Sequence, residues 1–409
     1  MSFQQGLSGL NAAAKNLDVI GNNVSNSGTV GFKQSQAQFA DVYANSLTGA
    51  GGSNVGIGTK VAQVSQLFTQ GNVTATNNPL DMAINGGGFF RMNNNGEISY
   101  QRNGQFQLDR LGFIVNPTGA QLTGYTANAS GVLSTGAPSP ITINTADLAP
   151  QITSEVNAVL NLDSGSTPID AVTTPFDMND PATFHSSTAV SVYDSLGNSQ
   201  TLQTFYVKRP SGVWDVYAAN DGTQIGAGTI GTLTFNTSGV LTTVPMPMGP
   251  INVPATATGA TTPFPVTLDF TGTTQFGAAF SVNSLDQDGY TSGRLAGFNV
   301  AADGLVMGRY TNGQSAVLGQ VVLANFANPN GLQPIGNNMW AESAASGAAL
   351  VGTPDSGSLG VLQSSAVEDS NVDLTAELVN MITAQRVYQA NAQTIKAQDA
   401  LLQTLVNLR

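Results

Sequence analysis

Apolar residues recur every seven positions at the C-terminal end of the chain. The first series comprises Leu374, Met381, Tyr388, Ile395 and Leu402. A second series lies four positions later and comprises Leu378, Gln385, Ala392, Asp399 and Val406. This spacing is typical of a helix that packs along another helix. Because the segment 372–409 also lacks Gly and Pro, it is predicted to form one long helix, with Asp373 as its N-cap, Glu377 in its first turn and Arg409 at its end.

The same spacing appears within the first 25 or so residues. One series comprises Phe3, Leu10, Leu17 and Val24, and its companion positions are Gly6, Ala13 and Ile20. The pattern predicts a shorter amphipathic helix that pairs with the C-terminal one through small residues. Packing of each helix on a separate globular core remains the alternative. Polar residues in the second series, Gln385 and Asp399, favour pairing, because polar positions of this kind set the register between helices.

Between the two helices, short apolar alternations are broken by turn dipeptides. Asn95-Gly96, Asn103-Gly104 and Gly197-Asn198 predict tight turns between antiparallel strands. Stretches rich in Gly, Pro, Ser and Thr mark candidate connections, and the segment 244–265 is expected to form a loop or an edge strand. Glycine-rich connections are expected at 49–58 and 352–360. The middle of the chain is therefore predicted to be β structure in more than one domain.

Composition excludes several classes of partner. Charged residues make up 9% of the chain and the net charge is −12, so no basic surface is available for nucleic acid or for an anionic membrane. Cysteine is absent, which excludes disulfides, thiolate metal sites and a cysteine nucleophile. Neither a cleaved signal peptide nor a membrane span is evident. We expect a soluble protein whose export, if any, uses a route without a cleaved signal.

Few residues could support catalysis. His185 is the single histidine and no nucleophile elbow accompanies it, so we expect it to be an ordinary strand or loop residue. Asp286 and Asp288 could form a carboxylate pair, as in a glycosidase, but their sequence is also that of a turn and lacks the glutamate that would complete a calcium loop. Gly86-Gly87-Gly88 is not followed by the Lys-Ser/Thr of a phosphate loop and is expected to permit a bulge or close packing. No catalytic residue, cofactor or metal site is predicted.

Two stretches carry a family resemblance. The first contains an Asn-Asn, Asn, Thr and Gly-Phe-Lys pattern at Asn22, Asn23, Asn26, Thr29, Gly31, Phe32 and Lys33. The second is the segment 368–409, and further similar segments lie at 102–109, 192–202, 285–295 and 319–326. Together they resemble the axial proteins of the bacterial flagellum, the rod and hook family, with Ser25 where alanine is usual. A length near 400 residues and a middle β region favour the hook members over the shorter rod proteins and the longer hook-filament junction proteins.

The resemblance implies a structural protein and not an enzyme. It implies a curved tube of identical subunits, the hook of the flagellar basal body outside the cell, which acts as a universal joint between motor rod and filament and lets exported subunits pass through its channel. The implied partners are further copies of the chain, a distal rod protein, a hook-filament junction protein, a hook cap protein during assembly and the flagellar type III export apparatus. A β-rich surface adhesin or a phage tail structural protein remains the alternative, and a carbohydrate-active enzyme with an Asp pair ranks behind it.

The resemblance and the composition boundaries together predict a mainly β, discontinuous, nested multi-domain protein with its termini paired in a helical coiled coil. The expected division is 1–27 with 368–409 as the inner helical domain, 28–75 with 352–367 as a connecting segment, 76–145 with 285–351 as a β domain, and 146–284 as an outer β domain. Ten apolar residues are predicted to bury area within and between copies: Phe3, Leu10, Leu17, Val24, Leu374, Leu378, Met381, Tyr388, Ile395 and Leu402.

A neutral polar face of the C-terminal helix is predicted either to line a central channel or simply to face solvent. It comprises Asn380, Thr383, Gln389, Asn391, Gln393 and Thr394.

Overall fold

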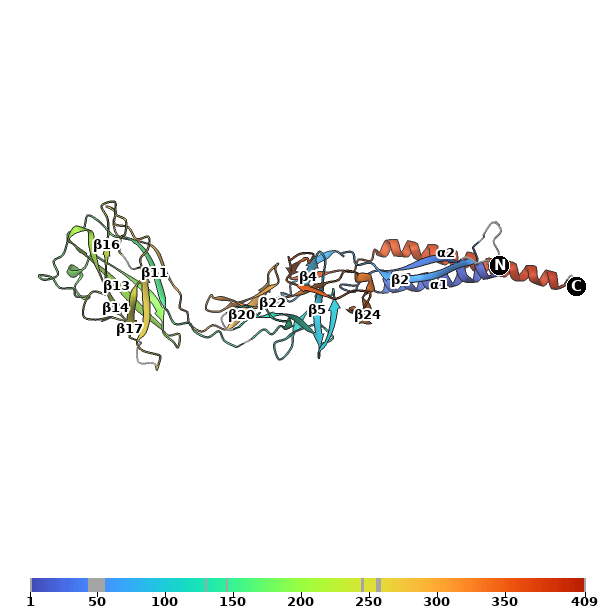
Figure 1. Cartoon of the computed structure of the whole chain (residues 1–409), viewed down its shortest axis with the longest axis horizontal. Helices are drawn as coiled ribbons and strands as arrows, with labels where there is room; N and C mark the ends of the chain where they lie inside the picture. Colours follow the sequence, from blue (N-terminus) through green and yellow to red (C-terminus); the bar gives the residue numbers. More distant parts are fainter. Residues whose placement is uncertain are drawn as a thin grey trace. The chain divides into compact units, whose positions relative to one another are not determined.

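The computed structural model describes residues 2–42, 56–128, 131–144, 146–243, 246–254 and 259–407, and it is mainly β with a helix at each end (Figure 1). Two compact units make up the chain. Unit 1 comprises Met1–Thr145, Gly297–Arg309 and Ser315–Arg409, and unit 2 comprises Ala146–Ala296 and Tyr310–Gln314. The predicted class, mainly β with paired terminal helices in a discontinuous multi-domain chain, is confirmed.

The terminal helices are α1 (Ser2–Ser25) and α2 (Leu374–Asn407), which lie side by side and run in opposite directions in unit 1 (Figure 1). The predicted N-cap is confirmed, because the Asp373 side chain accepts hydrogen bonds from the backbone N–H groups of Thr375 and Ala376 at 2.9 and 3.1 Å. Glu377 lies in the first turn as expected, but its side chain is buried. Arg409 lies outside the described residues.

A β-hairpin packs against α1. Strands β1 (Ser35–Val42) and β2 (Gly58–Gln66) pair antiparallel, with Ser35 opposite Gln66 and Val42 opposite Gly58. The glycine-rich connection predicted at 49–58 lies outside the described residues as far as position 55.

The main sheet of unit 1 has the order β20-β21-β22-β9-β5-β6-β25-β24, and from β21 to β24 neighbouring strands run antiparallel. Its strands are β20 (Leu295–Val300), β21 (Leu305–Tyr310), β22 (Ser315–Val321), β9 (Gln121–Thr126), β5 (Phe89–Asn94), β6 (Glu97–Gln101), β25 (Met339–Ala341) and β24 (Gln333–Gly336). Branches are formed by β7 (Gln107–Leu108), β8 (Ile114–Val115), β10 (Ser139–Pro140), β23 (Leu323–Asn325) and β26 (Leu350–Gly352). A short 3-10 helix, Pro329–Gly331, precedes β24.

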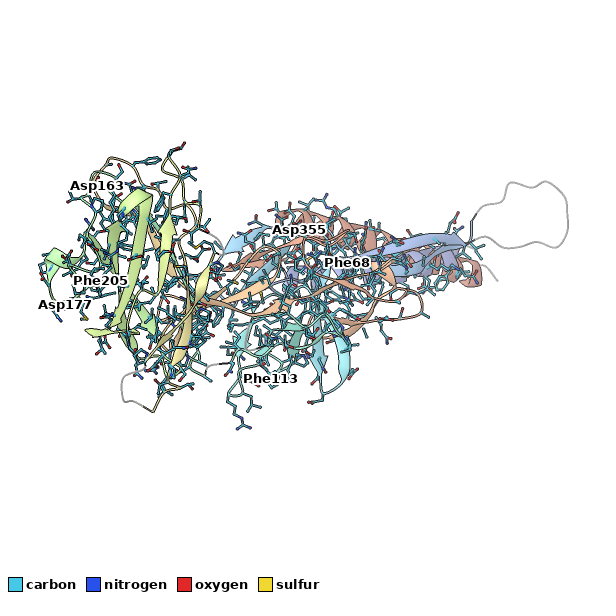
Figure 2. All side chains as sticks on the ribbon, turned by 60° about the vertical axis from the view of Figure 1, so that its left-hand side comes forward. Phe68, Phe113, Asp163, Asp177, Phe205 and Asp355 are labelled. Carbon is cyan, nitrogen blue, oxygen red and sulfur yellow. The ribbon has the colours of Figure 1, made fainter. Side chains whose placement is uncertain are left out.

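Two short strand pairs bring the C-terminal segment back to the start of the unit. Strand β27 (Val361–Ser364) pairs with β4 (Met82–Asn85), and β28 (Ala366–Glu368) pairs with β3 (Val73–Ala75). The aromatic core beside them centres on Phe89, whose ring meets those of Phe68, Phe326 and Trp340 edge to face at centroid distances of 5.4 to 5.9 Å. Phe68 is labelled in Figure 2.

One predicted hairpin is confirmed and one is wrong. Asn95-Gly96 joins β5 to β6, and both residues have the positive φ (53° and 97°) that the turn requires. Asn103-Gly104 is not a hairpin, because the strands on either side of it pair elsewhere. Gly104 instead permits a close backbone approach. A Cβ there would lie 1.6 Å from the Met82 carbonyl oxygen, and the Met82 N–H donates to Gly104 O at 2.9 Å.

Unit 2 contains two sheets that share one hydrophobic core. The first has the order β17-β18-β11-β19, with β17 (Met248–Val253), β18 (Phe264–Asp269), β11 (Glu155–Asn161) and β19 (Ser281–Gln287). The second comprises β12 (Ser186–Tyr193), β13 (Ser199–Arg209), β14 (Val213–Asn220), β15 (Thr223–Gln224) and β16 (Gly231–Thr234), with 3-10 turns at Pro181–Thr183 and Pro210–Gly212. Tyr206, Trp214 and Phe264 lie buried between the sheets.

The turns and boundaries predicted from the sequence agree only in part with the strands of unit 2. The Gly197-Asn198 turn joins β12 to β13 as predicted, with Gly197 at φ 81°. Within 244–265, β17 is an edge strand, which agrees with the expectation of loop or edge. The boundary predicted between 284 and 285 falls inside β19, which pairs with β11 along its length. Pairing with β11 therefore continues unit 2 past that point.

A second apolar cluster covers the opposite face of β13 and β14. Phe205, labelled in Figure 2, and Tyr217 pack there beneath a loop that contributes Phe176 and Phe184. The Phe176 and Tyr217 rings stack with centroids 4.1 Å apart.

Candidate assembly interface on the terminal helices

The contact between α1 and α2 is built from small residues. Gly6 and Gly9 face α2, where an added Cβ would lie 3.2 Å from Ile395 Cγ1 and 2.8 Å from Asn391 Oδ1, respectively. Ala13 on α1 and Ala384 on α2 are buried. Small side chains let the two helix backbones approach closely. The companion positions predicted on α1, Gly6, Ala13 and Ile20, are all buried.

On α2 the second series is one position away from the prediction. Buried or half-buried residues fall at Glu377, Ala384, Asn391 and Gln398, three positions after the first series, whereas Gln385 and Asp399 are exposed. The helix is therefore rotated relative to the pattern we expected. Spacings of three and four residues both return to the same helix face, so the apolar pattern could not distinguish them.

The ten apolar residues predicted for assembly are mostly not covered within one chain. Exposed fractions are 46% for Phe3, 45% for Leu374 and Leu378, and 54% for Leu402. Tyr388 is also exposed, and five residues are half-buried: Leu10, Leu17, Val24, Met381 and Ile395. Other large apolar side chains are exposed on α2: Val379, Ile382, Val387 and Leu401. At 100° per residue, four of the exposed residues share the side of the helix away from α1, and we call these the apolar surface of α2: Leu374, Leu378, Val379 and Ile382.

The predicted channel face does not form one continuous exposed strip. Asn391 faces α1 at Gly9, whereas Gln389, Gln393 and Thr394 are exposed. The Thr394 hydroxyl donates to the carbonyl of Ala390 within the helix, at 3.0 Å.

Buried hydrogen bonds between polar side chains hold the first turn of α2 against the end of α1. The Asn23 amide donates to Glu377 Oε1 at 3.1 Å and to the Ser35 carbonyl at 2.8 Å, and it accepts from the Ser35 N–H at 2.9 Å. The Gln34 amide also donates to Glu377 Oε1. Sequence analysis placed Asn23 in the family signature but missed Gln34 and the burial of Glu377.

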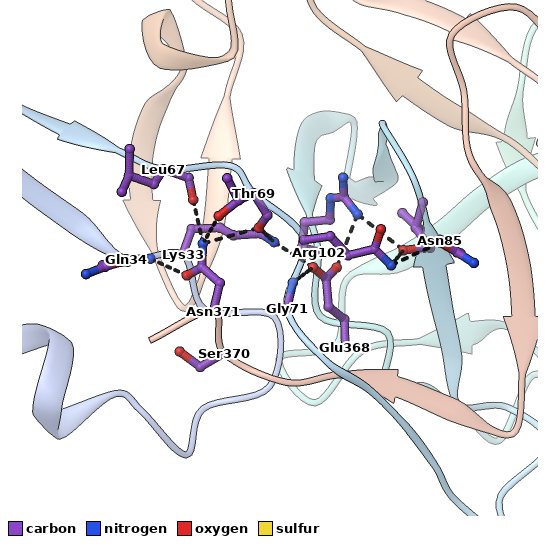
Figure 3. Close-up of polar contacts among 12 residues, drawn as sticks. Lys33, Gln34, Leu67, Thr69, Gly71, Asn85, Arg102, Glu368, Ser370 and Asn371 are labelled. Carbon is purple, nitrogen blue, oxygen red and sulfur yellow. Dashed lines mark hydrogen bonds and ion pairs between the residues drawn. The ribbon is translucent and has the colours of Figure 1, made fainter. Parts of the chain in front are cut away.

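Lys33, Arg102 and Glu368 form a buried ionic cluster that joins three segments of unit 1 (Figure 3). Lys33 Nζ lies 2.6 Å from Glu368 Oε1, and Arg102 Nη1 lies 3.1 Å from Glu368 Oε2. The Gly71 N–H also donates to Glu368 Oε1, at 2.8 Å. We call this group the ionic clasp.

Further donors and carbonyls complete the ionic clasp. Lys33 Nζ donates to the Thr69 carbonyl at 2.7 Å, and Arg102 Nη2 donates to the Gly86 carbonyl at 2.7 Å. Burial lowers the pKa of Lys33 and that of Arg102, although the Glu368 carboxylate opposes both shifts. The Glu368 carboxylate thus accepts hydrogen bonds from charged side chains and from a backbone N–H group. It thereby fixes the chain both where it leaves α1 and where it returns towards α2.

The remaining signature residues shape the turn between α1 and the ionic clasp. Asn26 donates from its side chain to the Asn22 carbonyl at 2.9 Å, and Thr29 donates to Asn26 Oδ1 at 3.3 Å. Gly31 has φ 68°, and a Cβ there would lie 2.5 Å from Asn103 N. Its N–H donates to the Glu368 carbonyl at 2.7 Å. Phe32 is half-buried. The motif thus ends a helix, turns the chain and delivers Lys33. Glu368 and Arg102 were missed as site residues, although charged residues make up only 9% of the chain.

The residues considered for catalysis or calcium binding make hydrogen bonds that hold local structure. His185 Nδ1 accepts from the Lys208 N–H at 3.1 Å, and Nε2 lies 2.7 Å from the Thr167 carbonyl, so the ring holds a loop to β13. Asp288 accepts from the backbone N–H groups of Ser154 and Glu155 at 2.8 and 3.0 Å. Its neighbour Asp286 accepts from the Ser284 hydroxyl at 2.7 Å.

The glycine triplet 86–88 packs closely against the returning chain, as expected. A Cβ on Gly86 would lie 3.0 Å from Gly360 Cα, and one on Gly87 would lie 2.9 Å from the Ser358 carbonyl oxygen. Over the described ranges, no three His, Asp or Glu side chains gather as a metal-ion site would require. In that same part of the chain, no helix combines the length and apolarity needed to cross a membrane.

Comparison with known families identifies the class. Residues 3–33 match the family described as flagella basal body rod protein, and residues 363–408 match the C-terminal family of flagellar basal body rod FlgEFG proteins. Residues 83–158 match the D1 domain of flagellar hook protein FlgE/F/G, and residues 161–290 match the D2 domain of flagellar basal body protein FlaE. The chain is a flagellar axial protein of the rod and hook class.

Full-length relatives narrow the class to one family. The chain is 45% identical over 416 residues to the flagellar hook protein FlgE of Salmonella typhimurium and 44% identical over 415 residues to that of Escherichia coli K12, with 100% of each chain covered. The crystal structure of Helicobacter pylori flagellar hook protein FlgE2 has the same fold, with a TM-score of 0.54, 14% identity, and coverage of 72% of this chain and 100% of that one. This chain belongs to the FlgE family of flagellar hook proteins. It is a structural subunit of the hook of the flagellar basal body, in a family not known for catalysis.

Proposed function

We propose that this chain polymerises with copies of itself into a curved tube that serves as a universal joint between motor rod and filament and lets exported subunits pass through its channel. The observation that supports this most is the apolar surface of α2, since Leu378, Val379 and Ile382 are 45%, 58% and 52% exposed on a helix whose other side already contacts α1. Burial of apolar area yields about 25 cal/mol per Å². In a structural subunit, contact with further copies of the chain covers such a surface.

The proposed partners are a distal rod protein, a hook-filament junction protein, a hook cap protein during assembly and the flagellar type III export apparatus. Both terminal segments match families described as rod proteins. A rod protein with similar terminal segments could therefore meet the first hook subunit through the contacts that hook subunits make with each other. This argument supports the rod contact more directly than the other three.

Electron microscopy of the purified protein after polymerisation tests the proposal. We expect hollow tubes with a continuous wall. Solid fibres or closed trimers would contradict it and would support the β-rich adhesin or phage tail alternative, which no feature of the described residues favours. Curved tubes from the intact chain alone would further support the role as a flexible joint.

A further inference from the structure

A loop of unit 2 covers one face of the sheet that contains β13 and β14. Residues 163–184 lie between β11 and β12, and four of their apolar side chains pack on the sheet face opposite the shared core: Ile169, Phe176, Met178 and Phe184. We call this loop the strap. Asp163 and Asp177 of the strap and Phe205 beneath it are labelled in Figure 2. Phe205 and Tyr217 are only 5% and 8% exposed, so the strap keeps an aromatic surface away from solvent.

His185, the single histidine of the chain, joins the strap to β13 through its ring. Nδ1 accepts from the Lys208 N–H at 3.1 Å, and Nε2 lies 2.7 Å from the Thr167 carbonyl oxygen. A backbone N–H group can only donate and a carbonyl oxygen can only accept, so the two contacts together require a neutral ring with its hydrogen on Nε2. Protonation adds a hydrogen to Nδ1, which can then no longer accept from the Lys208 N–H group.

A positive charge already lies beside this contact. Lys208 Nζ donates to the carbonyls of Ser164 and Ser166, at 2.5 and 2.8 Å, in the same segment of the strap that the His185 ring contacts. A protonated imidazole would place a second positive charge near the first, and like charges repel. Both effects of protonation oppose the closed position of the strap.

The acidic groups around the ring make their bonds elsewhere. Each strap carboxylate accepts from the backbone N–H group two positions later: Asp163, Asp170, Asp177 and Asp180. On β14, Asp215 forms an ion pair with Arg209 at 2.5 Å, and the uncharged Trp214 ring has its centroid 5.5 Å from that of His185. Within the described residues, no carboxylate bonds the His185 ring, so none stabilises its charged form by direct contact.

Other contacts hold the middle of the strap. Arg209 Nη1 donates to the Ile169 carbonyl at 2.7 Å, and the Ile169 N–H donates to the Lys208 carbonyl at 3.1 Å. The Phe176 ring stacks on that of Tyr217. Histidine is the side-chain type whose ordinary titration falls between about pH 5 and 8, so among these contacts only those of the His185 ring change with pH in this range.

We propose that His185 is a pH-sensitive switch that opens the strap. While the ring is neutral, the strap stays closed on β13 and β14. When the ring gains a proton, the contacts of residues 163–169 with β13 weaken, and the strap opens more often. The aromatic surface of Phe205 and Tyr217 then becomes accessible. The switch lies within a single chain and does not depend on the proposed polymerisation.

Hydrogen exchange of the full chain, measured by mass spectrometry and corrected for the intrinsic effect of pH on exchange, tests this proposal. The strap should exchange roughly tenfold or more faster at about pH 5 than at about pH 7.5, whereas β11 should not change. His185→Gln retains a donor and an acceptor but does not titrate, so its strap should exchange equally at both pH values. Asp288→Asn is the matched control, because it removes a different titrating group of unit 2 and should leave the response of the strap unchanged.

NMR gives a second readout, because a chain with one histidine has a single imidazole Cε1–H signal. Exchange of the strap should accelerate over the same pH range in which this signal titrates. Equal exchange of the strap at both pH values, or the same acceleration in His185→Gln as in the unmodified protein, would overturn the proposal. Should glutamine fail to hold the strap at about pH 7.5, the comparison of the two pH ranges decides, and ranges that do not coincide would contradict the switch.

Discussion

At the scale of single residues, the ionic clasp explains why a chain with 9% charged residues keeps three charges buried together. Lys33, Arg102 and Glu368 belong to segments far apart in sequence, and each charge is paired or bonded to a carbonyl or an N–H group. Such a cluster contributes little net stability over an apolar core, but it requires all three segments to be in place. It therefore fixes where the chain leaves α1 and where it returns.

Glu368→Gln should destabilise unit 1 by about 3–5 kcal/mol, because it leaves the buried Lys33 and Arg102 without their counter-charge. The free energy of unfolding in denaturant, followed by the fluorescence of Trp340 in a Trp214→Phe background, measures it. Trp214 is suited to removal because its indole N–H has no hydrogen-bond partner within the described part of the chain. The exposed Glu97→Gln is the matched control and should change the result by less than about 0.5 kcal/mol. Equal effects from the two variants would argue against the clasp.

Asp288→Asn should weaken unit 2 in a pH-dependent way. Burial acts to raise the pKa of Asp288, but hydrogen bonds from the Ser154 hydroxyl and from the Glu155 and Ser154 N–H groups outweigh it, so the pKa is lowered. At pH values between the folded pKa and the ordinary value of about 3.9, the unfolded chain binds more protons than the folded chain does. The contribution of Asp288 to stability is therefore complete above the ordinary value and is lost as the pH falls through the folded pKa. Denaturant unfolding followed by Trp214 fluorescence should show a deficit of about 1 kcal/mol at pH 7 that disappears in strong acid. A deficit of the same size at both pH values would contradict this.

The sequence predicts single residues well where the cause is local. The Asp373 cap and the Asn95-Gly96 turn follow from hydrogen bonds and φ angles within a few positions. The ionic clasp could not be predicted, because Glu368 meets partners 335 and 266 positions away. At Asn103-Gly104 a distant contact also decided the outcome, since the close approach of Met82 uses the glycine that the turn pattern assigned to a hairpin.

At the scale of elements, the two terminal helices pair through glycine and alanine and leave the apolar surface of α2 uncovered. The heptad pattern predicted both helices with their ends close to those observed. It could not specify which face each presents, because apolar residues lie on both sides of α2. Contact with a small-residue partner selected the face with Ala384 and Asn391.

Gly6→Leu should weaken the helix pair by about 1–3 kcal/mol, because even a Cβ would lie 3.2 Å from Ile395 and a longer side chain forces the helices apart. Gly21→Leu is the control on the same helix, where an added Cβ meets nothing within 4 Å. Because leucine favours the helix more than glycine does, Gly21→Leu should be as stable as the unmodified protein or up to about 1 kcal/mol more stable. Thermal unfolding followed by far-UV circular dichroism compares them. A loss of the same size in both variants would contradict the packing account, because leucine has the higher helix propensity at either position.

At the scale of the whole molecule, a structural hook subunit must bind its neighbours while the joint bends. The chain has 13 basic and 25 acidic residues among 409, so few strong ion pairs are available for contacts between copies. Neutral polar and apolar contacts are less directional than charge-assisted hydrogen bonds, and this allows them to shift at lower cost. The family resemblance, carried by motifs spread over the chain, made this function predictable from the sequence.

The polymer should depend weakly on salt. Exposed ion pairs weaken as the Debye length falls from about 8 Å at 0.15 M to about 3 Å at 1 M, whereas apolar contacts do not. We expect the polymerised fraction, measured by sedimentation, to change little over this range. Dissociation that rises steeply with salt would show that ion pairs hold the copies together.

The most direct measurement is the fraction of protein that sediments as polymer when Leu378→Asp and Ile382→Asp are introduced together. Both residues lie on the apolar surface of α2, and neither contributes to the helix pair contacts described above. If the terminal helices join copies of the chain, this variant should remain monomeric at concentrations where the unmodified protein and the control Leu111→Asp, at a 70% exposed site on the β part of unit 1, form tubes. Tubes formed equally well by the double variant would contradict the account.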